Sequence, residues 1–113
     1  MSVHEVSQNA LSAVGSPGQF LVLDFTATWC PPCKVMNPVF HSLAEDVEFK
    51  SVAFASIDVD ENQQLSQDHR VMSIPTFLVM KKNADGTLTE IKRMVGAQDP
   101  LSFRQEIAKA VAA

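Results

Sequence analysis

A continuous apolar run leads into the only two cysteines of this chain, and this combination limits the folds open to it. The run, Phe20–Thr26, is almost entirely apolar and does not alternate with polar residues. Such a run is typical of a strand covered on both faces, as in an α/β sheet. Trp29, Cys30 and Cys33 follow within a few residues. We therefore expect a buried strand that delivers two thiols to the start of a helix.

The composition is that of an ordinary globular chain and excludes several kinds of partner. The chain has 113 residues, of which 46% are hydrophobic and 19% charged, enough for one domain spanning 1–113. A net charge of −4 without a basic cluster argues against nucleic acid and anionic membranes. No apolar run approaches the roughly 20 residues of a bilayer span, and the N-terminus lacks a secretory signal pattern. We therefore expect a soluble, cytoplasmic protein.

The cysteine pair predicts redox chemistry or metal binding in such a protein. The cytosol keeps thiols reduced, so a structural disulfide is disfavoured there. A structural zinc site needs four ligands, and no histidine or further cysteine lies near Cys30 and Cys33 in the sequence to complete one. We therefore expect no metal at this pair.

Apolar periodicity and capping residues predict an alternation of strands and helices. The predicted strands span residues 3–6, 20–26, 51–59, 77–80 and 88–95, the last with a bulge or a partly exposed edge. The predicted helices are 7–15, one that starts near 32, 63–69, and one that starts after 99. This order favours a single mixed sheet, with a parallel core and an antiparallel terminal hairpin, flanked by helices on both faces.

The predicted helix after the cysteines has a core-facing stripe that continues past a proline. Pro38 removes one backbone hydrogen bond but does not end the helix, because apolar residues recur beyond it at steps of three and four. The stripe consists of Val35, Met36, Val39, Phe40, Leu43 and Val47. We assign it to the core rather than to a cofactor site.

Acidic residues stand at two notable places. Asp24 interrupts the apolar run and is either an edge residue facing solvent or a buried carboxylate whose pKa burial would raise. The segment 58–62 is acidic but lacks the spacing of a calcium loop, so we interpret it as a solvated strand end. His41 and His69 are expected at the surface.

A set of residues spread over essentially the whole chain, in the right order, resembles the motifs of the thioredoxin family. The matching residues are Asp24, Trp29-Cys30-Pro31-Pro32-Cys33-Lys34, Pro38, Ile74-Pro75-Thr76 and Val95-Gly96-Ala97. The resemblance implies a thioredoxin fold and a dithiol–disulfide oxidoreductase that reduces disulfides in proteins through a mixed disulfide.

The resemblance also implies a role for each matching residue. Cys30 would be the exposed attacking thiol, Cys33 the buried resolving thiol, and Asp24 the base for Cys33. Pro75 would follow a cis peptide bond opposite the Cys30–Cys33 disulfide. The rim of the surface that binds a substrate polypeptide would include Trp29, Pro31, Pro32, Ile74, Pro75 and Gly96.

Two residues depart from the usual thioredoxin pattern. Pro31 stands where glycine is common, as in the Cys-Pro-Pro-Cys run of tryparedoxins. Consecutive prolines supply no N–H groups, so Cys33 and Lys34 are the expected donors to the Cys30 sulfur, with the helix starting at Pro32. Ser56 replaces a lysine found in many bacterial members, which predicts an Asp24 pKa raised mainly by desolvation.

Partners and alternatives follow from the resemblance. No bound cofactor is expected; electrons would come from NADPH through a separate thioredoxin reductase-type flavoprotein, and disulfide-containing proteins such as peroxiredoxins would be substrates of a monomer. One alternative is a tryparedoxin-like carrier fed by a small dithiol. Another is a protein-binding module that keeps the fold without turnover.

Overall fold

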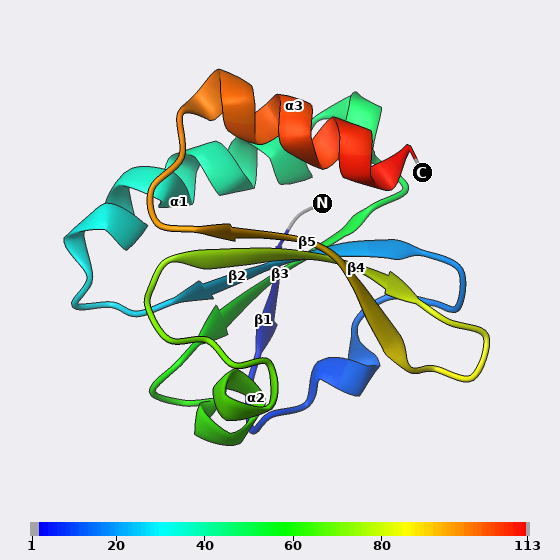
Figure 1. The fold of residues 1–113 in the computed structure, drawn as a ribbon, viewed down its shortest axis with the longest axis horizontal. Helices are drawn as coiled ribbons and strands as arrows, with labels where there is room; N and C mark the ends of the chain where they lie inside the picture. The colour runs from blue at the N-terminus through cyan, green and yellow to red at the C-terminus, as the bar shows by residue number, and fades with distance from the viewer. Residues whose placement is uncertain (1–2, 113) are drawn as a thin grey trace.

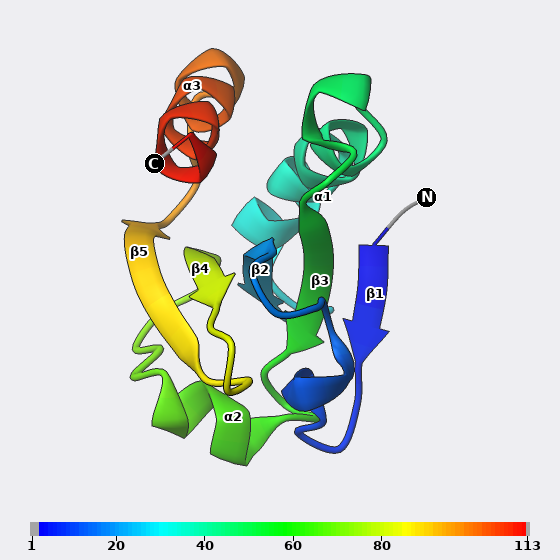
Figure 2. The ribbon, with the colours of Figure 1, turned by 90° about the vertical axis from the view of Figure 1, so that its right-hand side faces the viewer.

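The computed structural model describes residues 3–112 and contains a five-stranded sheet between two layers of helices (Figure 1). The strands are β1 (Val3–Val6), β2 (Phe20–Thr26), β3 (Ala53–Asp58), β4 (Thr76–Lys82) and β5 (Leu88–Val95). The helices are α1 (Pro31–Ala44), α2 (Gln63–Asp68) and α3 (Pro100–Val111), with 3₁₀ turns η1 (Leu11–Ala13) and η2 (Val47–Phe49). Seen along the sheet, α1 and α3 cover one face and α2 the other (Figure 2).

The sheet has the mixed topology that the sequence predicts. Its strand order is β1-β3-β2-β4-β5, with β1 and β2 parallel to β3 and with β4 antiparallel to β2 and β5. The register of β5 against β4 passes from Lys92 to Glu90 and leaves Ile91 as an extra residue. This confirms the predicted bulge and explains why the apolar residues of β5 do not alternate cleanly.

The central strand β2 is buried on both faces. Leu21, Leu23 and Phe25 contact the core on the α2 side of the sheet, whereas Val22 contacts the core on the α1 and α3 side. Because side chains alternate along a strand, Asp24 points to the same side as Val22, toward α1. Strand β2, which leads into the cysteines, is therefore fixed in the middle of the molecule.

Helix α1 confirms most of the predicted stripe and corrects two of its members. Met36, Phe40 and Leu43 are buried, and Pro38 lies inside the helix. Val35 is 67% exposed, because the buried face of α1 is centred on Met36, Phe40 and Leu43 and Val35 lies well to one side of it. Val47 is also exposed, because α1 ends at Ala44 and Val47 belongs to η2.

The helix predicted over 7–15 is wrong. Its only regular part is the turn η1, and Gln8 and Asn9 have left-handed backbone angles, with φ of 52° and 58°. The Asn9 N–H donates to the Asn62 side chain, and the Asn9 side chain accepts from the Leu65 N–H. These bonds to distant residues replace the helical ones, so the predicted helix does not form.

Candidate active site

Cys30 and Cys33 lie at the N-terminus of α1 and are joined by a disulfide, with their Cα atoms 5.3 Å apart. Cys30 is the N-cap residue, and its Sγ accepts a 3.3 Å hydrogen bond from the Cys33 N–H. The predicted second donor is wrong, because the Lys34 N–H bonds to the Cys30 carbonyl oxygen. The helix begins at Pro31, one residue earlier than predicted. Since neither proline has an N–H, Cys33 supplies the first free donor of the helix.

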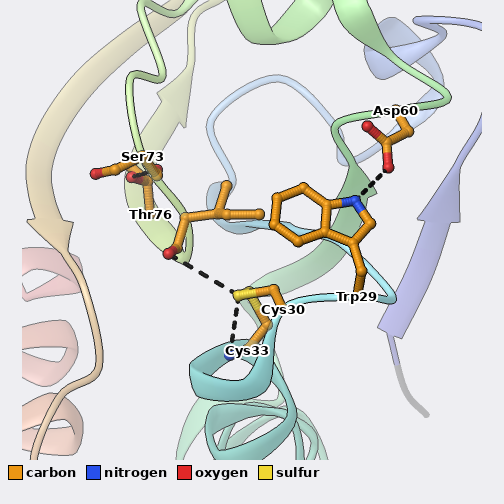
Figure 3. Close-up of a disulfide and its surroundings, with 7 residues drawn as sticks. Trp29, Cys30, Cys33, Asp60, Ser73 and Thr76 are labelled. Carbon is orange, nitrogen blue, oxygen red and sulfur yellow. Dashed lines mark hydrogen bonds between the residues drawn. A yellow bond between two sulfur atoms is a disulfide. The ribbon is translucent and has the colours of Figure 1, made fainter.

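The prediction of an exposed Cys30 is wrong for this disulfide form. Both cysteines are 3% exposed, and they form a small apolar cluster with Ala27 against which Val59 and Ile74 pack. The Cys30 Sγ lies 4.0 Å from the Ile74 carbonyl oxygen (Figure 3). The Cys30 sulfur therefore lies just below the surface, between the N-terminus of α1 and the loop that precedes β4.

That loop meets the disulfide through a cis peptide bond between Ile74 and Pro75, as the resemblance implies. The Thr76 hydroxyl donates to the Ser73 carbonyl at 2.6 Å and closes the turn that contains this cis bond. The Gly96 N–H donates to the Pro75 carbonyl at 2.8 Å and joins the end of β5 to the same loop. The residues predicted to form the substrate rim are thus brought together around the disulfide.

Trp29 lies beside the disulfide and is held by a residue that sequence reasoning missed. Its indole N–H donates to an Asp60 carboxylate oxygen at 2.7 Å, while 63% of Trp29 remains exposed (Figure 3). Asp60 is itself oriented by a bond from its N–H to the Asp58 side chain. The acidic segment after β3 therefore anchors the tryptophan, in addition to being solvated. No local sequence signal marks this pairing, because the two residues lie 31 positions apart and an exposed indole N–H can also donate to water.

Asp24 is a buried carboxylate and not an edge residue facing solvent, the other alternative that the sequence allows. It is 2% exposed, and its Oδ1 has no hydrogen-bond partner among the described residues. Burial raises the pKa of Asp24 from 3.8 to about 7, with desolvation as the cause. The expectation of a desolvation-dominated pKa is therefore confirmed.

A cavity of about 470 Å³ connects the region of Asp24 with the second cysteine. Cys33 and His41 line it from α1, and Thr26 and Ser56 line it from the sheet. Ser56 is the partner of Asp24 in the register of β2 and β3, and Thr26 lies two residues further along the same face. The cavity is therefore lined by Cys33 and by neighbours of Asp24, although Asp24 itself is not part of the lining. His41 is exposed as predicted, while His69 is half-buried and desolvation lowers its pKa.

Such a site can carry out thiol–disulfide exchange, and comparison with known proteins supports this chemistry. The family model for thioredoxin matches residues 2–109 of the chain. The chain belongs to the thioredoxin family. It is a thiol–disulfide oxidoreductase of the disulfide-reductase type. Thioredoxin H5 of Arabidopsis thaliana is 41% identical over 93 residues, which cover 82% of this chain and 73% of that protein. Thioredoxin of Mus musculus is 44% identical over 78 residues, covering 69% and 70%.

Solved thioredoxin structures agree with the fold. A Malassezia sympodialis thioredoxin superposes with a TM-score of 0.83 at 32% identity, over 97% of this chain and 91% of that one. Oxidised mitochondrial thioredoxin 3 of Saccharomyces cerevisiae gives 0.72 at 29% identity, over 95% and 94%. As thioredoxins do, the protein acts on disulfide substrates. No helix within residues 3–112 is long and apolar enough to cross a membrane, and that same part of the chain contains no metal-binding group of three His, Cys, Asp or Glu.

Proposed function

We propose that Cys30 attacks the substrate disulfide, that Cys33 resolves the mixed disulfide, and that Asp24 accepts the proton of Cys33. The observation that carries the proposal is the hydrogen bond from the Cys33 N–H to the Cys30 sulfur at the first turn of α1. Free N–H groups and the helix dipole favour the thiolate form of a cysteine at this place. Cys30 is therefore the thiol of the pair that is prepared to attack.

The reaction conserves atoms and electrons in two exchanges. The Cys30 thiolate attacks one sulfur of the substrate, forms a mixed disulfide and releases the other substrate sulfur as a thiolate. Cys33 gives its proton to Asp24, attacks the Cys30 sulfur, closes the Cys30–Cys33 disulfide and releases the second substrate thiolate. The substrate gains two electrons and the dithiol loses two. The intramolecular second step is fast because the two sulfurs are held three residues apart on one helix turn.

The carboxyl of Asp24 suits the role of proton acceptor. With a pKa of about 7, it is a stronger base than an ordinary aspartate and is about half ionised at neutral pH. It lies on the same face of the sheet as α1, and the cavity beside it also reaches Cys33. No other carboxylate on β2 competes with it, because the strand contains no second acidic residue.

The substrate polypeptide would lie across the rim around the disulfide. Exposed Trp29 and the exposed prolines of the motif form one side, and the cis-proline loop with Gly96 forms the other. The full set consists of Trp29, Pro31, Pro32, Ile74, Pro75 and Gly96.

The electron donor follows from the reducing role. We propose NADPH, acting through a separate flavoprotein reductase, with no cofactor bound to this chain, and cytoplasmic disulfide proteins such as peroxiredoxins as substrates of the monomer. Pro31 favours one second candidate, a small dithiol as donor, as in tryparedoxins. Turnover measured with a flavoprotein thioredoxin reductase and with a small dithiol, each as the sole reductant, distinguishes the two.

The reductase activity is tested by insulin reduction with dithiothreitol. We expect the wild type to accelerate precipitation of the insulin B chain and Cys30→Ser to be inactive. Cys33→Ser, reduced and then freed of dithiothreitol, should accumulate a mixed disulfide with insulin. Asn37→Ala, which changes the cavity wall outside the cysteine pair, is the control and keeps the motif intact. A wild type no faster than dithiothreitol alone would instead favour a binding module.

A further inference from the structure

The loop that carries the cis-proline is held at one end by Arg93 of β5 and at the other by Gly96, the residue that follows β5. At the C-terminal end of the loop, the Gly96 N–H donates to the Pro75 carbonyl at 2.8 Å. At the N-terminal end of the loop, the Arg93 guanidinium donates to the His69 carbonyl at 2.6 Å and to the Arg70 carbonyl at 3.2 Å. Gly96 and Arg93 are only three residues apart. The end of β5 and the residue after it therefore set where the segment 71–75 lies against the disulfide.

The two carbonyls held by Arg93 lie just past α2, which ends at Asp68. His69 and Arg70 follow the last turn of α2, where carbonyl groups have no partner within the helix. Arg70 also has a left-handed backbone angle, with φ of 55°, which turns the chain from the helix into the loop. The guanidinium thus fixes the turn from which the loop departs.

The guanidinium is itself fixed by Glu90. The Arg93 Nε and Nη2 atoms donate to the two carboxylate oxygens of Glu90 at 3.1 and 2.9 Å, while Nη1 and Nη2 reach the two carbonyls. This arrangement uses the planar donor fork of arginine, which lysine lacks. The charge of Arg93 is balanced and its plane is oriented, so its contacts position the loop rather than attract an anion.

The loop between these anchors is the part that faces the substrate. The Ile74 carbonyl lies 4.0 Å from the Cys30 sulfur, and Met72 is 92% exposed at the surface of the segment. We propose that Arg93 is a positioning residue that sets the affinity of this enzyme for polypeptide disulfides by holding the cis-proline loop against Cys30. This proposal rests on the proposed function, in which the polypeptide lies along Ile74 and Pro75.

The proposal distinguishes large from small substrates. A polypeptide that contacts the loop loses binding when the loop is displaced, whereas a small aromatic disulfide needs only the Cys30 sulfur. The test variant is Arg93→Met, which keeps the length of the side chain and removes its donors. Arg104→Met is the matched control, because Arg104 also binds two carboxylates, Asp46 and Glu48, and these lie away from the cis-proline loop.

Two assays are compared. Initial rates over a series of insulin concentrations, with dithiothreitol as reductant, give KM and kcat for a protein substrate. A single turnover of pre-reduced protein with 5,5′-dithiobis(2-nitrobenzoate) gives the rate for a small one. For Arg93→Met we expect an insulin KM raised roughly tenfold, with kcat and the small-disulfide rate within about twofold of wild type. Arg104→Met should match wild type in both assays.

Hydrogen exchange provides a readout that a general loss of stability would not give. In Arg93→Met, exchange should accelerate in peptides covering 70–75 and stay unchanged in β2. Should this variant not fold, Arg93→Lys replaces it. Lysine keeps the charge but lacks the donor fork, so the insulin KM should rise by less than the tenfold expected for Arg93→Met. An unchanged insulin KM in the folded variant, or an equal loss with both disulfides, would overturn the proposal. A wild type inactive toward both substrates would instead overturn the proposed function.

Discussion

Replacing Asp24 with asparagine should change how the stability of the oxidised protein depends on pH. The carboxyl has a pKa of about 7 in the folded state, against 3.8 for an ordinary aspartate. Between these two pH values the folded state binds a proton that the unfolded state has released. The free energy of unfolding of the wild type therefore falls as the pH rises from 4 to about 7, because the buried carboxyl must ionise without a partner.

The expected size follows from the two pKa values. At about 1.36 kcal/mol for each pH unit, the difference between 3.8 and about 7 corresponds to on the order of 4 kcal/mol. Asparagine has nearly the same shape and does not ionise. Asp24→Asn should therefore gain up to this amount over wild type at pH 8, and little at pH 4.

Urea unfolding followed by far-ultraviolet circular dichroism at several pH values between 4 and 8 measures this difference. The oxidised form is used so that the cysteines do not titrate. Asp46→Asn is the control with the opposite sign, because the hydrogen bond from Arg104 lowers the pKa of Asp46. The stabilisation that the wild-type Asp46 carboxylate contributes is present above the pKa of the unfolded state and is lost as the pH falls. Parallel pH curves for wild type and Asp24→Asn would show that the pKa of Asp24 is the same in the folded and unfolded states, and would refute the reasoning.

Three further predictions concern the motif, its tryptophan and a buried lysine. Pro31→Gly should shift the redox potential, because Pro31 stiffens the turn between the cysteines; equilibration with glutathione measures it, and equal potentials would contradict the reasoning. Asp60→Ala should free the indole N–H of Trp29, so that its proton exchanges faster in NMR spectra and the insulin KM rises; an unchanged exchange rate would exclude the bond in solution. The Lys82 ammonium donates to the carbonyls of Ser12, Val14 and Gly15 at 2.9 to 3.2 Å. Lys82→Met should destabilise the protein by roughly 1–3 kcal/mol in urea unfolding, with no change in disulfide reduction.

The sequence predicts well those elements whose pattern is local. The run that forms β2 is continuous because both faces of the strand are covered, and its predicted bounds equal the observed ones. The last helix starts at Asp99-Pro100 as predicted, with the Asp99 side chain accepting from the Ser102 N–H at 3.1 Å. In both cases the residues that decide the structure stand within a few positions of each other.

Predictions fail where the deciding partner is distant in the sequence. Asn9 adopts a left-handed conformation because it bonds to Asn62 and Leu65, more than fifty residues away. Asp60 receives the indole of Trp29 across 31 positions, and Arg93 holds carbonyls 23 and 24 residues upstream. No local pattern contains these pairings, so the anchors of the active site emerge only when the sheet brings them together.

The bond between Trp29 and Asp60 has a spectroscopic consequence. The chain contains one tryptophan and no tyrosine, so its near-ultraviolet absorption and emission come almost wholly from one indole. That indole precedes Cys30 directly and is 63% exposed. Opening of the disulfide, docking of a polypeptide and release of Asp60 would each alter the surroundings of this chromophore. The unlabelled protein thus contains its own optical probe, located at the site where thiols and disulfides exchange.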